Sequence, residues 1–273
     1  KQDLLDSAIT DIANYGECQG QAQHQASVSG KLAFGEIGEK QWQSLQLAIA
    51  PLIQQCESHM VEKNNQPLEI NLPFYSLFSG ADQVDDKHSE DTQLCVKASV
   101  EQPVFVLGWI ANTYHEQLVH VVPSKLKAKH VLKLLLEHSM LCAMGHKFNA
   151  RLICQDAVLT IAPKDNVQAI EYIKPLLEQF LLAQRRPLPL LPETAWQSIR
   201  PANQGAKKEY SHIKASNEAF YGTSGEFGKA AEREDLHVER CLGLLGDIPE
   251  QTQSMAHTLF SDWLDSMEIT PHD

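Results

Sequence analysis

VFVLGWIANTYHEQLVHVVPSKLKAKHVLKLLLEHSMLCAMG, residues 104–145, is the stretch of this 273-residue sequence that decides the fold. Its first half is rich in β-branched and aromatic residues, which favour strands, in two runs at Val104–Tyr114 and Gln117–Val122. The runs are close enough to form a hairpin around His115 and Glu116. We therefore expect an antiparallel strand pair here.

The second half of this stretch predicts a long helix, because apolar residues recur at three- and four-residue steps. We expect Ser124 to cap the helix and Gly145 to end it. On a helix, a four-residue spacing brings side chains to one face. In the predicted helix, the face with this spacing is basic at the N-terminal end. The residues with this spacing are Lys125, Lys129, Lys133 and Glu137.

Upstream of the hairpin, the sequence predicts a helix over 38–63 and a strand at Leu68–Leu72. Pro51 lies inside the helical pattern and is expected to kink it, whereas Pro73 is expected to end the strand. Two further features precede the hairpin, namely a polar acidic loop at Gly80–Thr92 and a strand at Leu94–Ala98.

Downstream, two more strands are predicted at Ala150–Cys154 and Val158–Ala162. Asp165 and Gln168 have the spacing of a capping box, so we expect a helix to begin near Asp165. Pro187 is expected to stop this helix. The order of three strands, a helix, two strands and a helix predicts an α/β fold of the α+β kind, a mixed sheet flanked by helices.

The rest of the chain is predicted to be helical to its end, with segments near 203–220, 230–244 and 250–267. We therefore expect an α/β core with N-terminal helices at 1–186 and a helical C-terminal subdomain at 187–273. The last segment has an amphipathic stripe that is interpreted as core rather than as a partner surface. The stripe consists of Met255, Leu259, Phe260, Trp263, Leu264 and Met267.

Composition limits the class of protein. A hydrophobic content of 43% suits a globular core, and no apolar run reaches the roughly 20 uncharged residues of a membrane helix. Six cysteines without a Cys-x-x-Cys pair favour buried thiols in a reducing, cytoplasmic compartment. The sequence begins at Lys1 without methionine or a signal peptide, which suggests a piece of a longer polypeptide.

The charge is unevenly distributed. The chain has a formal net charge of −12, yet residues 120–214 contain 14 Lys and Arg against 7 Asp and Glu. The overall charge argues against a nucleic-acid binder that uses its whole surface. A phosphate-facing surface within the basic third and a chance excess on solvated faces both fit this pattern.

Familiar catalytic and cofactor motifs are missing from the sequence. It has no Gly-x-x-x-x-Gly-Lys-Ser/Thr loop for nucleotide phosphates and no Gly-x-Gly-x-x-Gly after a strand. His237 with Cys241, and His130 with His138, share helix faces but lack the further ligands of a zinc site. We therefore expect neither a metal nor a cofactor.

Hydrolysis of phosphodiesters with Mg²⁺ needs two or three carboxylates on adjacent strands, commonly with a lysine beside the attacking water. A nuclease of the Pro-Asp-(Asp/Glu)-x-Lys type would carry them on the strands within 104–122, before the long helix. These carboxylates are missing. The sequence therefore predicts that the domain is not an enzyme by itself.

Several short motifs run in order along nearly the whole chain. They are Phe34–Glu36, Gly108–Ala111, Gln117–His130, Leu141–Gly145, Pro187–Trp196, Gly225 with Glu226, and Arg240. In this order they resemble the C-terminal region of the exodeoxyribonuclease V gamma chain, the RecC family. The joint order, rather than any single motif, carries the resemblance.

The resemblance implies a restriction-endonuclease-like fold that has lost its catalytic groups. It implies that Ala111 replaces the first metal-binding Asp and that the second position falls near Val122 or Pro123, while the lysine survives as Lys125. Apolar side chains do not bind magnesium. The resemblance and the search for carboxylates therefore agree.

The resemblance also implies a structural role in the RecBCD helicase and nuclease, which acts in double-strand-break repair and recombination. The role is to guide or split DNA strands and to bind the partner subunits RecB and RecD. Among aromatic residues, we expect Trp109 in the core and consider Tyr114 for base stacking. The side chains expected near phosphates are those of Lys125, Lys127, Lys129 and Lys133.

Two alternatives stay open. One is a pure protein-interaction scaffold, in which the acidic surface and the C-terminal helices dock partners while DNA lies elsewhere. The other is an active Mg²⁺-dependent nuclease that uses scattered acids such as Glu69, Glu101 or Glu116.

Overall fold

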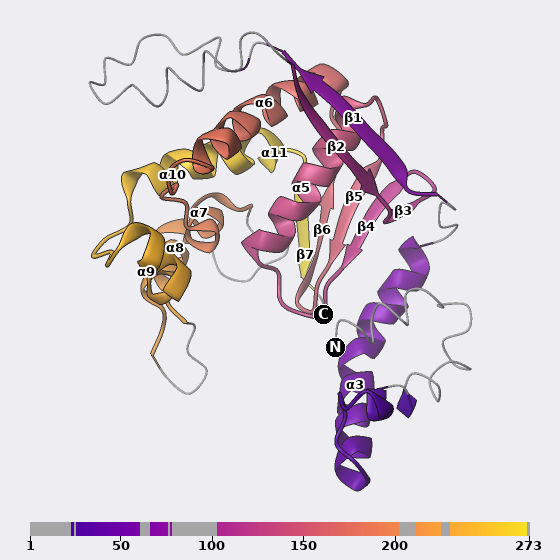
Figure 1. Ribbon diagram of the computed structural model, residues 1–273. Helices are drawn as coiled ribbons and strands as arrows, with labels where there is room; N and C mark the ends of the chain where they lie inside the picture. Colours follow the sequence, from indigo (N-terminus) through magenta and orange to yellow (C-terminus); the bar gives the residue numbers. More distant parts are fainter. Residues whose placement is uncertain are drawn as a thin grey trace.

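A computed structural model contains two sheets with helices around them (Figure 1). The predicted α+β fold is confirmed. The acidic loop predicted at 80–92 and the strand predicted at 94–98 lie outside the described residues. The described ranges are 23–24, 26–60, 66–75, 77, 103–201, 211–224 and 230–271.

The first sheet is an antiparallel ribbon of β1 (Leu68–Phe74) and β2 (Val104–Ile110). β1 continues through Pro73, so the prediction that this proline ends the strand is wrong. Pro73 lies opposite Phe105. Because each strand of a two-stranded ribbon has a free edge, a residue without an N–H can sit in it without breaking the ladder.

The predicted hairpin forms between β3 (Thr113–Tyr114) and β4 (Gln117–Val121), with His115 and Glu116 at its turn. His115 has a φ of 49°, the left-handed conformation that such tight turns require. The run 104–114 is not one strand, however, because β2 pairs with β1 and β3 pairs with β4. The two-residue gap after Ile110 therefore transfers the chain from one sheet to the other.

The second sheet has the order β3-β4-β5-β6-β7. β5 (Asn149–Ile153) and β6 (Ala157–Ile161) match the predicted strands to within one residue. β4 and β5 are parallel and are joined through helix α5 (Ala128–Ala143), whereas the other pairs are antiparallel. The sheet is therefore mixed, as the element order predicted.

β7 (Met267–Pro271) pairs with β6, so the prediction of helix to the end of the chain is wrong there. Met267 and Ile269 are buried and alternate with exposed residues, a period of two that marks a strand. The preceding helical elements are α7 (Pro192–Ile199), α8 (His212–Tyr221), a 3₁₀ turn (Glu232–Glu234), α9 (Leu236–Leu242), α10 (Glu250–Ala256), a π-helical segment (His257–Ser261) and α11 (Asp262–Leu264).

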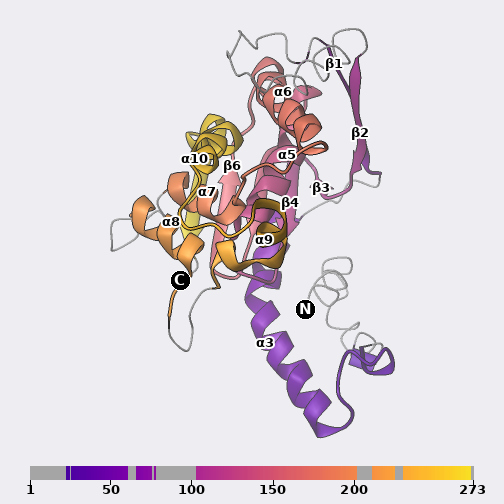
Figure 2. The same ribbon diagram turned by 60° about the vertical axis from the view of Figure 1, so that its left-hand side comes forward.

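Helices cover both faces of the five-stranded sheet (Figure 2). Leu118 faces the core beneath α5 and α6 (Asn166–Ala183), whereas its neighbour Val119 packs with Leu52 of α3 (Glu36–His59) on the opposite face. The Asp165 carboxylate accepts the N–H of Gln168 at 2.9 Å, which confirms the predicted cap of α6.

The main core crosses the predicted division at 186/187. Trp196, Phe260 and Trp263 are fully buried in the same cluster as the sheet residues Leu152 and Leu159. The amphipathic stripe of the last segment is therefore core from Leu259 to Met267, as predicted, whereas Met255 is half-buried outside this cluster. The division itself stays a prediction. The elements of the predicted C-terminal subdomain supply part of the core of the predicted α/β domain at 1–186.

Two composition-based predictions bear on the described residues. Cys56, Cys142 and Cys154 are buried thiols that form no disulfide, whereas Cys241 is exposed. No helix within the described ranges combines the length and apolar character needed to cross a membrane.

Candidate nucleic-acid interface

The basic segment between β4 and α5 differs from its prediction. α5 begins at Ala128, so Ser124 does not cap it, and Lys125 and Lys127 precede the helix. The side chain of Glu193 in α7 accepts the Ala128 N–H at 2.9 Å. A carboxylate 65 residues further along the chain thus accepts a backbone N–H that the first turn of α5 leaves unpaired. Local sequence rules do not reveal such a contact.

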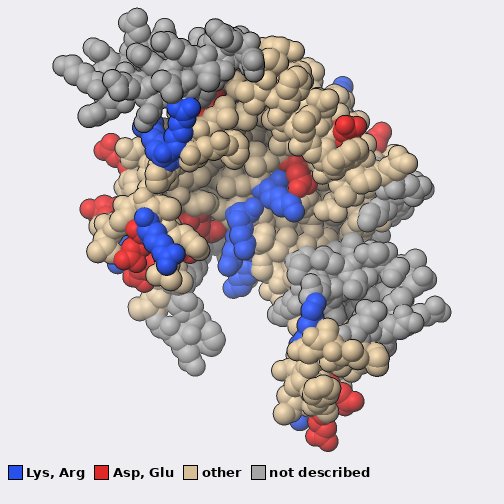
Figure 3. All heavy atoms as spheres, viewed as in Figure 1, with Lys and Arg blue, Asp and Glu red and all other residues tan. Residues whose placement is uncertain are grey.

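Exposure alternates along this segment. Leu126 and Ala128 are buried, at 6% and 1% exposure, while the three lysines around them point outward. Lys127 has φ −130° and ψ 152°, an extended conformation. We call Lys125, Lys127 and Lys129 the lysine strip. Figure 3 shows Lys and Arg side chains gathered over the beginning of α5.

Three backbone hydrogen bonds hold the segment. The Leu126 N–H donates to the Asp156 carboxylate at 2.7 Å, and the Gln155 N–H donates to the Ser124 carbonyl at 3.0 Å. The third is the bond from Ala128 to Glu193. The lysine strip therefore projects from a backbone that is fixed at alternate residues.

The strip carries uncompensated positive charge. No acid of the described ranges lies within ion-pair distance of its three ammonium groups. Lys133, further along α5, differs because its ammonium lies 3.9 Å from Glu137. Burial, followed by the charges of Lys129 and Lys127, lowers the pKa of His130, so its ring is mostly neutral at pH 7.

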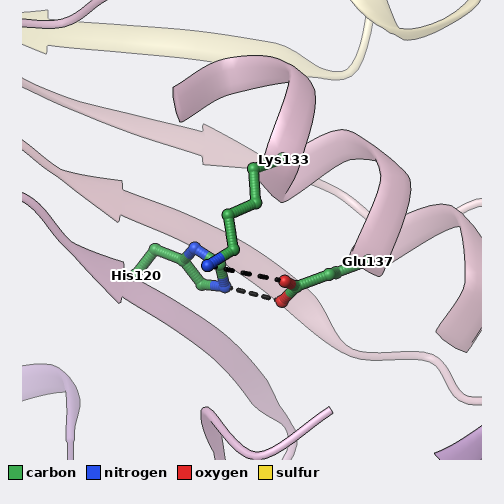
Figure 4. Close-up of polar contacts among 3 residues, drawn as sticks. All are labelled: His120, Lys133 and Glu137. Carbon is green, nitrogen blue, oxygen red and sulfur yellow. Dashed lines mark hydrogen bonds and ion pairs between the residues drawn. The ribbon is translucent and has the colours of Figure 1, made fainter. Parts of the chain in front are cut away.

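A second polar contact ties α5 to the sheet. The Nε2 atom of His120 on β4 lies 2.7 Å from the Glu137 carboxylate, which Lys133 also approaches (Figure 4). His120 is 6% exposed. We did not predict this pair, although a lone imidazole inside the apolar run 118–122 was a signal for it.

The positions expected to have lost metal-binding acids lie near this contact. Ala111 is exposed in the gap between the two sheets, and Val122 and Pro123 are half-buried just after β4. Thr113 pairs with Leu118, and the Val119 N–H donates to the Asn112 carbonyl at 3.0 Å. Ala111 therefore lies one residue before the paired part of this hairpin, and Val122 lies one residue after the end of β4.

The two aromatic expectations are reversed in the structure. Tyr114 is 4% exposed and packs with Leu52 and Cys56, and burial raises its pKa to about 12. Its ring has no exposed face on which a base could stack, so we do not carry Tyr114 into the proposed interface. Trp109 is 68% exposed, so the prediction that it is a core residue is wrong.

Trp109 is exposed because β2 belongs to a two-stranded ribbon, one face of which no other described element covers. Phe105 and Leu107 lie on the same face as Trp109 and are 52% and 68% exposed. An apolar groove of about 590 Å³ runs between β2 and the helices α5 and α6. Large exposed apolar surfaces of this kind are typical of interaction sites.

Of the two pairs considered for zinc, His130 and His138 contact different partners in the structure. His138 is fully buried with its Nε2 atom 2.7 Å from the Phe148 carbonyl, whereas the Nε2 atom of His130 contacts Ser124 at 3.3 Å. His237 and Cys241 are exposed. In the part of the chain that the structure describes, no three His, Cys, Asp or Glu side chains group as metal ligands would.

The fold and the site define an α+β protein with a mixed sheet, a basic segment and no grouped metal ligands among the described residues. A family model, that of the RecC C-terminal domain, matches residues 1–202. This match covers most of the chain, which therefore belongs to the RecC C-terminal domain family, a family of the RecBCD complex. No curated protein matches the sequence.

Proposed function

We propose that this chain is a non-catalytic domain that guides DNA strands within the RecBCD complex. The observation that carries the proposal is the lysine strip, in which three exposed ammonium groups, without acidic partners among the described residues, project from a fixed backbone. Lysines in such a position bind phosphates without reading bases. Lys133 is a weaker candidate because Glu137 offsets part of its charge.

The test is the affinity for a fluorescein-labelled oligo-dT, measured by anisotropy over a range of salt concentrations. Each phosphate neutralised on a single strand contributes about 0.7 to the slope of log K against log salt. The variant K125A/K127A/K129A is therefore expected to bind more weakly and to lower the slope by about 2. Equal slopes for this variant and the wild-type chain would refute the role of the strip.

The matched control is K40A/K147A/K214A, which removes three exposed lysines elsewhere. It changes the net charge by the same amount, so any general effect of charge is common to both triple variants. Binding that falls equally in the two variants would show a diffuse electrostatic attraction and no defined interface.

The absence of catalysis is part of the proposal. It is supported by Ala111, which offers no carboxylate, and by the position of Glu69 on β1 and Glu116 in the hairpin turn, on different sheets. We expect no Mg²⁺-dependent cleavage of labelled DNA by the purified chain. Cleavage that co-purifies with the chain and vanishes in E69Q, E101Q or E116Q would establish the nuclease alternative.

A second role, binding of the partner subunits, is favoured by the exposed face of β2. Phe105, Leu107 and Trp109 form one apolar row beside the groove. We expect F105S/L107S/W109S to reduce capture of RecB or RecD, whereas K125A/K127A/K129A leaves capture unchanged. The opposite result would place partner binding at the lysine strip instead.

A further inference from the structure

Two carboxylates hold the lysine strip without contacting its ammonium groups. Asp156, in the turn between β5 and β6, accepts the Leu126 N–H at 2.7 Å. Glu193, in the first turn of α7, accepts the Ala128 N–H at 2.9 Å. Both bonds end on the backbone of the residues between the lysines. The acids therefore fix the positions of the lysines without forming ion pairs with them.

Glu193 is itself fixed by its surroundings. Its second carboxylate oxygen accepts a bond from the Gln197 amide at 2.7 Å. The Glu232 carboxylate holds the start of α7 by accepting the N–H groups of Glu193 and Thr194 at 3.0 and 2.8 Å. Both oxygens of Glu193 are thus engaged, and the helix that carries it is capped by a residue from the C-terminal part of the chain.

We propose that Asp156 and Glu193 are positioning residues that hold the lysine strip along the backbone of one DNA strand. The inference rests on the proposed function and adds these two residues and the preference for a single strand. In extended chain, alternate residues repeat at about 6.6 Å, the spacing expected for Lys125 and Lys127, and Lys129 follows as the second residue of α5. A single row of lysines follows one sugar-phosphate backbone, whereas a duplex presents two backbones to a surface.

The sign of the effect separates positioning from simple electrostatics. Removing an acid near a phosphate-binding surface makes the local field more positive, which by itself strengthens DNA binding. Removing the hydrogen-bond acceptor frees the backbone beneath the lysines, which weakens DNA binding. Asn and Gln remove the charge but keep an acceptor oxygen, whereas Ala removes both.

The experiment measures binding of oligo-dT by the full 273-residue chain and its variants. We expect D156N and E193Q to bind as tightly as the wild-type chain or more tightly. We expect D156A and E193A to bind roughly three- to tenfold more weakly. This fold-change corresponds to the net contribution of about one hydrogen bond. A duplex of the same length is expected to lose less affinity than oligo-dT in the alanine variants.

D165A is the matched control. It removes a carboxylate that caps α6 through the Gln168 N–H, the same kind of contact away from the strip. We expect its affinity for oligo-dT to be unchanged. A second measurement, amide hydrogen exchange at Leu126 and Ala128, is expected to show faster exchange in D156A and E193A but not in D156N and E193Q.

The outcomes separate the two proposals. If K125A/K127A/K129A binds oligo-dT as the wild-type chain does, the proposed function and this inference both fail. If that variant loses affinity while the alanine variants of Asp156 and Glu193 match their amide variants, only this inference fails. If a variant does not fold, as judged by circular dichroism, the other position and the exchange data decide.

Discussion

His138 is an imidazole placed where a charge is costly. It is fully buried, its Nε2 atom lies 2.7 Å from the Phe148 carbonyl, and its ring centroid lies 5.0 Å from that of Trp263. Burial lowers its pKa to about 4, against the smaller opposing effect of the Phe148 carbonyl. The ring is therefore neutral at pH 7, with Nε2–H donating to the carbonyl.

This shift makes stability depend on pH with a definite sign. Below pH 6.5 the unfolded chain binds a proton at His138 that the folded chain does not bind until about pH 4. The contribution of His138 is therefore present above pH 6.5 and is lost as the pH falls towards 4, by about 3 kcal/mol in total.

Urea unfolding at pH 7 and pH 4 measures this contribution when the wild-type chain is compared with H138Q. Gln keeps a donor for the Phe148 carbonyl but does not titrate. We expect the free energy of unfolding to fall by about 3 kcal/mol less in H138Q than in the wild-type chain. Equal falls would mean that His138 has the same pKa in the folded and the unfolded chain.

At the scale of the element, local patterns predicted most of the described structure. β5, β6 and the cap of α6 at Asp165 follow from alternation and capping rules that act within a few residues. The start of α5 could not be predicted in the same way, because the acceptor for Ala128 comes from Glu193.

The candidate site was predictable in its residue types and not in its geometry. The lysines are visible in the sequence, but their alternate exposure depends on Asp156 and Glu193, which approach from two other elements. The roles of Trp109 and Tyr114 were reversed for a similar reason. A strand pattern does not say which sheet covers its face, and α3 covers Tyr114 while the outer face of β2 stays open.

β7 was missed because a helical stripe runs up to Met267, where the strand begins. Its contribution to stability is testable. Ile269 is fully buried opposite Leu159 on β6. We expect I269A to lower the free energy of unfolding by about 2–5 kcal/mol, because it leaves a cavity in the core.

The control for this prediction is T270A, on the exposed side of the same strand. We expect its cost to stay below about 1 kcal/mol in the same urea titration. If the two substitutions cost the same, β7 is not packed on the core as described.

At the scale of the whole molecule, the position of the charge matters more than its sum. The net charge of −12 repels DNA at a distance, so the proposed binding of DNA requires a local surface of positive charge. The lysine strip supplies such a surface because its anchoring acids are engaged by backbone N–H groups. In the proposed function, an acidic protein thus presents a local basic contact to a single strand.

The shared core makes a last prediction about the molecule as a unit. Trp196 and Trp263 come from the predicted C-terminal subdomain, yet both are buried in one cluster with the five-stranded sheet. We therefore expect one cooperative urea transition, with midpoints that coincide for tryptophan fluorescence and far-ultraviolet circular dichroism. W263A is expected to destabilise the chain by about 3–5 kcal/mol and to shift both midpoints together, because it empties a site that helices and sheet share. Two separated transitions, or a W263A variant in which only the fluorescence midpoint moves, would show that residues 187–273 fold as an independent unit.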